Sequence, residues 1–308
     1  MRCLRSCVLF LWAVSLQVSL WAQPYYRLRI PDQQALRRFF TYHEGIWPVV
    51  SAHRGGSFDG YPENCLQTFD YLLQQTHAII ECDIAMTRDS VLVLMHDDLI
   101  DRTSTGEGRV GSFTWDELSR FRLEDARGEA TAWRIPLLTE TLAWAQGKTV
   151  LMLDVKRSTP LERVVQAVET ADAEAWCVII VYKMEDALRV HRLNPSLLVS
   201  VNIQDQGALD HYLASGFPDS CAVAFTGVKL ADTDLFKALQ QRGMRSILGT
   251  MGNLDQKALT RGAELVFIDL LRQGPDILST DYPIVLGKVI RESFTLSDED
   301  KPFFLFPE

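Results

Sequence analysis

Short runs of β-branched and aliphatic residues alternate with helical patterns along most of this chain, and this alternation restricts the fold more than any other feature. Nine runs are predicted as strands, over residues 48–52, 78–84, 91–95, 149–155, 177–181, 197–201, 221–225, 244–249 and 277–280. Helical patterns between them include 64–75, 139–145, 161–171, 232–242 and 263–271. Repeated β-then-α units are typical of a parallel sheet whose right-handed crossovers contain helices.

Two α/β folds fit this pattern: a (β/α)8 TIM-type barrel and a doubly wound open sheet. The open sheet normally carries a glycine-rich phosphate turn after its first strand. Here that position reads Ser51-Ala52-His53-Arg54-Gly55-Gly56, which is not the glycine-rich turn of a dinucleotide-binding fold. We therefore expect the barrel, with one of the nine strands peripheral or misassigned. The segment 97–147 is longer than an ordinary connection between such elements.

The charge of the chain excludes one large class of partner. The 308 residues carry a formal net charge of −9 and contain no basic run, whereas nucleic acids select clustered Lys and Arg. Hydrophobic residues make up 47% of the chain, which is enough to bury a full core. We expect a compact globular protein that does not bind nucleic acid.

The N-terminus has the pattern of a secretory signal peptide. Arg2 and Arg5 precede an apolar run over 8–21, which is shorter than a membrane-spanning helix requires. We predict a leader over 1–22 and an exported chain, periplasmic or secreted, with one barrel domain over 23–296. The alternative is that the leader stays attached as an anchor. The sequence does not indicate an oligomeric state.

The C-terminal tail, residues 297–308, is acidic at first and then aromatic, with Phe303, Phe304 and Phe306 close together. We expect these side chains to pack on the protein's own domain. The alternative is that the tail docks on a partner or a membrane surface, which no other part of the sequence indicates.

Ionisable residues gather at the carboxyl ends of four consecutive predicted strands. They are His53 and Arg54 after the first strand, Glu81 and Asp83 within the second, His96 and Asp97 after the third, and Asp154 and Lys156 in the fourth. Residues two apart in a strand share a face, so Glu81 and Asp83 point the same way. If that face is the barrel interior, three carboxylates and one ammonium group meet where barrel enzymes keep their sites.

Three adjacent carboxylates repel one another unless a cation or protons relieve them, and oxygen ligands suit Mg²⁺ or Ca²⁺. His53 and His96 are the candidates for acid/base work near neutral pH. Arg54 and Lys156 are suited to an anionic phosphate oxygen. The set as a whole favours phosphoryl transfer, although Asp154 and Lys156 could simply pair with each other.

In their order along the chain, these residues resemble the motifs of glycerophosphodiester phosphodiesterases, a family of phosphatidylinositol-phospholipase-C-like barrels. The matching motifs are His53-Arg54-Gly55-Gly56, Pro62-Glu63-Asn64, Glu81-Cys82-Asp83, Thr87-Arg88-Asp89-Ser90, Val93-Leu94-Met95-His96-Asp97, Asp101-Arg102-Thr103-Ser104, Gly106 to Val110, Ile135-Pro136-Leu137-Leu138, Asp154-Val155-Lys156 and Thr280-Asp281-Tyr282-Pro283. Between about 157 and 275 the chain matches only as alternating strands and helices.

The resemblance implies a (β/α)8 barrel with an insertion at about 99–147 and one bound divalent metal ion, Ca²⁺ or Mg²⁺. It implies the following site residues: Glu81, Asp83 and Asp154 as metal ligands, with Glu63 as an additional residue of the metal site; His53 and His96 as the acid/base pair; and Arg54 and Lys156 on the phosphate.

Two departures from the family pattern concern the site. Asp154 stands where the family usually has Glu, one methylene longer. Gly249-Thr250-Met251 stands where the family often has Trp followed by Thr, so the wall of the alcohol pocket is expected to differ.

The resemblance implies metal-dependent hydrolysis of glycerophosphodiesters to glycerol 3-phosphate and an alcohol. One alternative is a lipid-active phosphodiesterase of the lysophospholipase D type. Another is a non-catalytic barrel that binds a phosphorylated ligand, which the presence of both histidines and all three carboxylates disfavours.

Overall fold

The computed structural model describes residues 25–56 and 58–307, so the predicted leader over 1–22 lies outside the described residues. Eight parallel strands close into a barrel, because each strand pairs with the next and β2 also pairs with β3. In order around the barrel they are β2 (Val49–Ala52), β3 (Ile79–Met86), β5 (Leu151–Val155), β6 (Cys177–Ile180), β7 (Leu198–Asn202), β8 (Ala222–Phe225), β9 (Ser246–Gly249) and β10 (Ile277–Thr280). The predicted TIM-type barrel is confirmed.

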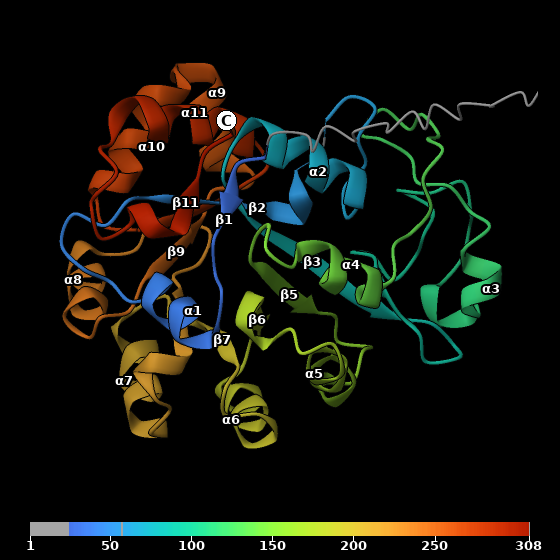
Figure 1. Cartoon of the computed structure of the whole chain (residues 1–308), viewed down its shortest axis with the longest axis horizontal. Helices are drawn as coiled ribbons and strands as arrows, with labels where there is room; N and C mark the ends of the chain where they lie inside the picture. The colour runs from blue at the N-terminus through green and yellow to red at the C-terminus, as the bar shows by residue number, and fades with distance from the viewer. Residues whose placement is uncertain (1–24, 57, 308) are drawn as a thin grey trace, which may run out of the picture.

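Helices surround the strands on the outside (Figure 1). They are α2 (Leu66–Gln75), α4 (Leu138–Ala145), α5 (Leu161–Thr170), α6 (Met184–Leu193), α7 (Gln206–Ser215), α8 (Thr233–Gln241), α9 (Asn253–Arg261), α10 (Ala263–Arg272) and α11 (Pro283–Ser293). Each buries one stripe; α5, for example, buries Leu161, Val164, Val165 and Val168, the spacing of a single helix face. Within the described part of the chain, no helix is long and apolar enough to span a membrane.

The strand predicted over 91–95 is not part of the barrel. β4 (Leu92–Leu94) pairs antiparallel with Ile84–Met86, because β3 is eight residues long and continues past the barrel rim. Asp154 therefore lies on the third barrel strand, whereas the sequence predicted a fourth. The insertion follows β4 and has its own apolar core, which includes Ile100, Val110 and Leu123. Its helix α3 (Trp115–Leu118) stands apart from the barrel in Figure 1.

The two ends of the described chain meet at the amino ends of the barrel strands. β1 (Arg27–Leu28) pairs antiparallel with β11 (Phe304–Leu305), and the two lie side by side in Figure 1. The ring of Phe304 packs edge-on against Trp47, which nearly adjoins β2, with ring centroids 4.6 Å apart. The aromatic tail thus packs on its own domain, as predicted.

His77 lies under this tail, and we expect its burial to make the fold sensitive to acid. The residue is 5% exposed, and its Nε2 lies 2.8 Å from the Leu305 carbonyl oxygen. Burial lowers the pKa of His77 to about 4, so the folded protein holds the ring neutral. This contribution to stability is present above about pH 6.5, the pKa of an exposed histidine, and is lost as the pH falls toward 4.

We expect the free energy of unfolding to drop by roughly 2 kcal/mol through His77 between pH 7 and pH 5. His77→Gln keeps a side-chain donor but does not titrate, so this variant should lose less stability over the same interval. Urea unfolding at both pH values measures the difference. Equal losses in the wild type and in His77→Gln would assign the acid sensitivity to other groups.

Candidate active site

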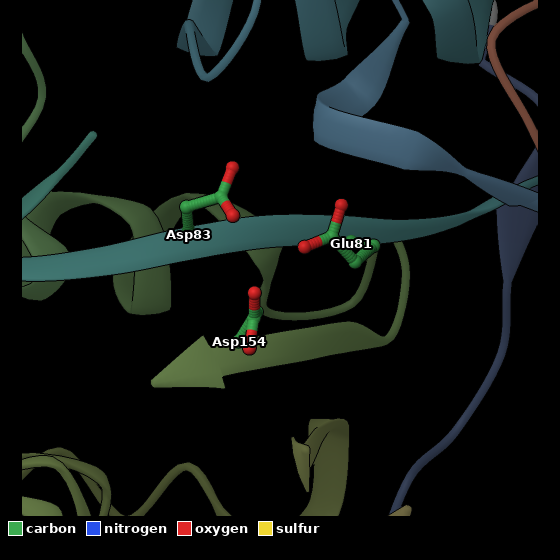
Figure 2. Close-up of side chains that lie close together, drawn as sticks. All are labelled: Glu81, Asp83 and Asp154. Carbon is green, nitrogen blue, oxygen red and sulfur yellow. The ribbon is translucent and has the colours of Figure 1, made fainter. Parts of the chain in front are cut away.

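Three buried carboxylates meet at the carboxyl ends of two neighbouring strands (Figure 2). Glu81 and Asp83 project from the same face of β3, and Asp83 pairs in register with Asp154 on β5. The three residues are only 7%, 0% and 7% exposed, and one oxygen from each lies within 4.8 Å of the others. The structure therefore brings together three of the four predicted metal ligands.

The charges of this cluster are only partly compensated. Lys156 Nζ lies 2.5 Å from Asp83 Oδ1 and 2.8 Å from Asp154 Oδ2. Burial would raise the pKa of Asp83, but the Lys156 ammonium outweighs it and holds that pKa below its usual value. Burial, with Asp83 and then Asp154 nearby, raises the pKa of Glu81 to about 8. Three carboxylates face the Lys156 ammonium and, 3.8 Å from Asp83, the Arg54 guanidinium, so the cluster still has more negative than positive charge and suits a further cation.

The donor set fits a hard divalent cation. Ca²⁺ and Mg²⁺ bind carboxylate oxygens at about 2.0–2.6 Å, so oxygens within 4.8 Å of one another can share one ion. All three groups also come from rigid strands. The ordinary way to keep buried carboxylates ionised is a partner cation, and a metal would supply it.

Both predicted histidines are held by an aspartate. His53 lies just after β2, and its Nδ1 is 2.7 Å from Asp281 Oδ1, in the loop after β10. His96 lies just after β4, and its Nδ1 is 2.5 Å from Asp97 Oδ1. Because a carboxylate only accepts, Nδ1 donates in each pair and Nε2 stays free for chemistry. Burial would lower the pKa of His53, but its bond to Asp281 and the nearby Glu81 raise it overall.

Arg54 is fixed at the cluster by its backbone as well as its side chain. It adopts a left-handed conformation, with φ of 55°, and its backbone N–H donates to Glu81 Oε2 at 2.7 Å. Its guanidinium Nη1 donates to both oxygens of Glu63, at 3.0 and 3.2 Å, and its Nε lies 3.8 Å from Asp83 Oδ2.

Glu63 is not brought into the carboxylate cluster. Its oxygens accept hydrogen bonds from Arg54 and from Arg102, a residue of the insertion. The structure thus places Glu63 beside the candidate phosphate-binding arginine, in a role that the motif alone did not indicate.

Tyr182 is a site residue that the sequence did not reveal. It follows β6, and its hydroxyl donates to Asp154 Oδ1 at 2.8 Å while 61% of the residue is exposed. Asp154 therefore has a partner on each oxygen, Tyr182 on one and Lys156 on the other. A single tyrosine after an apolar strand has no sequence signature.

Two of the cavities that Tyr182 lines contain the predicted histidines. One, of about 220 Å³, opens at the barrel mouth and contains His53, Glu81 and Asp154. It also has polar groups from β7 and its loop, and an apolar wall; these are Ser200, Asn202, Gln204, Phe225, Ile247 and Met251. The other, of about 720 Å³, contains His96 and Lys156. The two histidines thus line separate cavities, and Lys156 connects the second cavity to the carboxylate cluster.

The model of the Glycerophosphoryl diester phosphodiesterase family matches residues 53–271. The chain is 30% identical over 163 residues to a glycerophosphodiester phosphodiesterase of Caldanaerobacter subterraneus subsp. tengcongensis, covering 51% of this chain and 67% of that protein. It is 38% identical over 109 residues to Bacillus subtilis YhdW, covering 35% of this chain but only 44% of YhdW.

Solved structures match over more of the chain. A Glycerophosphoryl diester phosphodiesterase from Parabacteroides distasonis superposes with a TM-score of 0.88 at 34% identity, covering 92% of this chain and 99% of that one. An Oleispira antarctica phosphodiesterase, solved with the product sn-glycerol-3-phosphate, has a TM-score of 0.63 at 21% identity, and the match covers 80% of this chain and 97% of that one. The second likeness is one of fold.

Proposed function

Because the chain belongs to the Glycerophosphoryl diester phosphodiesterase family, we propose that it hydrolyses glycerophosphodiesters to glycerol 3-phosphate and an alcohol. One observation carries the proposal: three buried carboxylates form a cluster at the carboxyl ends of the barrel strands, and the two strand-end histidines are each oriented by an aspartate. The Oleispira antarctica phosphodiesterase, which shares the fold, binds glycerol 3-phosphate as a product.

Glu81, Asp83 and Asp154 would hold one divalent cation, Ca²⁺ or Mg²⁺. Bound there, the ion would neutralise charge on the phosphate oxygens and polarise the phosphorus–oxygen bonds. Arg54 and Lys156 would add positive charge beside it, and Arg54 can grip two oxygens at once.

The histidines would move the protons. Each presents a free Nε2, because its Nδ1–H is directed to an aspartate. One ring would take the proton from the attacking oxygen, and the other, as imidazolium, would give a proton to the leaving alkoxide. The two rings line different cavities, which is consistent with separate roles for the two histidines.

The test is release of glycerol 3-phosphate from a panel of glycerophosphodiesters by the purified protein. The assay is run with the protein as purified, with the protein treated with EDTA, and with the EDTA-treated protein after Ca²⁺ or Mg²⁺ is added. We expect release that EDTA abolishes and one of the ions restores. Release that is indifferent to EDTA would refute the metal, and no release from any diester would refute the substrate class.

A lipid substrate is the second candidate. The larger cavity has Leu99 and Tyr182 on its wall, and these residues are 45% and 61% exposed. Such apolar surface beside the His96 side of the site could receive an acyl-bearing alcohol or glyceride. Faster turnover of lysophospholipids than of water-soluble glycerophosphodiesters would favour this candidate.

We also propose that the chain is exported, on the strength of Arg2, Arg5 and the apolar run that follows. N-terminal sequencing of the protein recovered from outside the cytoplasm tests it. A mature start near Gln23 is expected, and recovery only from the cytoplasm would contradict export.

Tyr182→Phe should weaken metal binding about 10-fold without unfolding the protein. Hydrogen bonds to a metal ligand typically contribute about 10–100-fold to affinity, and Asp154 would lose the donor on Oδ1. Isothermal titration with Ca²⁺ and Mg²⁺ measures the change. Tyr42→Phe is the matched control, because that tyrosine lies near the amino ends of the strands. Equal affinities in both variants and the wild type would show that the hydroxyl does not support the site.

A further inference from the structure

We propose that Arg102, a residue of the insertion, is a positioning residue that holds both His96 and Arg54 in place through two carboxylates at once. The inference rests on the proposed function, because it concerns the proton-transfer and phosphate-binding groups of that same site. Neither the motif comparison nor the carboxylate cluster assigns Arg102 a role.

One edge of the Arg102 guanidinium orients His96. Its Nε donates to Asp97 Oδ2 at 2.6 Å, and the other oxygen, Oδ1, is the one that His96 Nδ1 contacts at 2.5 Å. With one oxygen held by Arg102, the carboxylate has little freedom to turn. Asp97 then keeps the His96 ring in the tautomer that leaves Nε2 unprotonated and facing the larger cavity.

The opposite edge acts on Arg54. Arg102 Nη1 and Nη2 donate to the two oxygens of Glu63 at 3.0 and 2.7 Å, a two-pronged contact. Both Glu63 oxygens also accept from Arg54 Nη1. The guanidinium of Arg54 is thereby directed along Glu63, with its Nε turned toward Asp83.

The charges show that Arg102 acts through geometry. Two arginines face two carboxylates in this network, so net charge does not draw a phosphate to Arg102. The Glu63 side chain is 14% exposed and that of Asp97 30%, so solvent screens these contacts less than ordinary surface pairs. Only a planar guanidinium offers three donors in this fork, so lysine cannot make all three contacts.

The same insertion offers a matched control. Arg109 lies 3.6 Å from Asp98, and both side chains are more than half exposed, at 69% and 67%. Isolated exposed pairs of this kind contribute little. Arg109→Ala therefore removes an arginine and one ion pair from the insertion without touching the network.

The first experiment measures turnover of a glycerophosphodiester by the metal-loaded full chain carrying Arg102→Lys, Arg102→Ala or Arg109→Ala. We expect kcat to fall roughly 10- to 100-fold in both Arg102 variants and less than about twofold in Arg109→Ala. Millimolar guanidinium should restore part of the activity of Arg102→Ala, since the arginine side chain is 49% exposed. Wild-type turnover in the same assay checks the proposed function separately. Full activity in Arg102→Lys would overturn the inference.

A double-mutant cycle tests whether both carboxylates are involved. The loss caused by Arg102→Ala should shrink in an Asp97→Asn background and again in a Glu63→Gln background, because each removes one of its partners. Losses that add fully in both backgrounds would mean that Arg102 acts some other way.

A measurement without metal or substrate makes the inference testable even if turnover is low. In ¹⁵N-histidine-labelled protein, the His96 resonances, assigned with His96→Gln, should report a single Nδ1–H tautomer in the wild type. In Arg102→Ala they should report a mixture of tautomers, and in Arg109→Ala the wild-type pattern. An unchanged tautomer in a folded Arg102→Ala or Arg102→Lys protein would overturn the orienting role.

Discussion

His96→Ala is expected to lower kcat for glycerophosphodiester hydrolysis by about 10²–10⁴-fold, the usual contribution of a positioned acid/base group. His96 presents a free Nε2, its Nδ1 is held by Asp97 at 2.5 Å, and it shares a cavity with Lys156 beside the carboxylate cluster. The ring contacts no member of that cluster through a hydrogen bond in the described part of the chain, so metal binding should change little.

The measurement is steady-state turnover at saturating metal, with Ca²⁺ or Mg²⁺ affinity determined in parallel. His211→Ala is the matched control, because this exposed histidine lies on α7 outside both cavities of the site. The kcat of Asp97→Asn should lie between those of His96→Ala and His211→Ala, since an amide can accept from Nδ1 but carries no charge to stabilise an imidazolium. A His96→Ala protein that turns over like the control would remove His96 from the mechanism.

Much of the site could be predicted because its information is local. Glu81 and Asp83 are two apart in an apolar strand, so they share a face wherever that strand lies. Asp154 ends another apolar run, and parallel strands present their carboxyl ends at one rim. The alternation of side chains along a strand and the position of these residues at strand ends were together enough to predict that the three carboxylates lie close together.

Other contacts of the site could not be predicted, because they join distant parts of the chain. His53 and Asp281 are 228 positions apart and meet because β10 pairs with β2 to close the barrel. Arg102 reaches Glu63 across 39 residues through the fold of the insertion. The strand predicted over 91–95 has the right residues but the wrong place, because β3 runs beyond the barrel and pairs with it there.

Glu81→Gln is expected to have opposite effects on metal binding and on the metal-free fold. The amide removes one of the three carboxylates proposed as ligands, so affinity for Ca²⁺ or Mg²⁺ should fall by roughly 100-fold or more, beyond the change expected for a hydrogen-bond partner of a ligand. Turnover should fall with it at fixed metal concentration. Asp83 and Asp154 would remain, still bridged by Lys156.

The metal-free fold should respond to pH in a direction set by Glu81. Its pKa is raised to about 8 in the folded state, so the protonated carboxyl is the form that the fold favours. The stability this provides is present below the unfolded pKa near 4.5 and is lost as the pH rises toward 8. Glutamine resembles the protonated acid at every pH. In EDTA at pH 9 the free energy of unfolding of the variant, measured with urea, should therefore exceed that of the wild type by at least about 1 kcal/mol.

Both effects come from one cause, the repulsion among three buried carboxylates that a metal ion would relieve. Calorimetric titration and urea unfolding in EDTA therefore test it together, with the exposed Glu107→Gln as control. Weaker metal binding with a more stable metal-free fold is the expected pair of results. A variant that binds metal as tightly as the wild type would exclude Glu81 as a ligand. A variant that is less stable at pH 9 would mean that the carboxylate is already compensated without a metal, and that the cluster is a structural ion-pair network around Lys156.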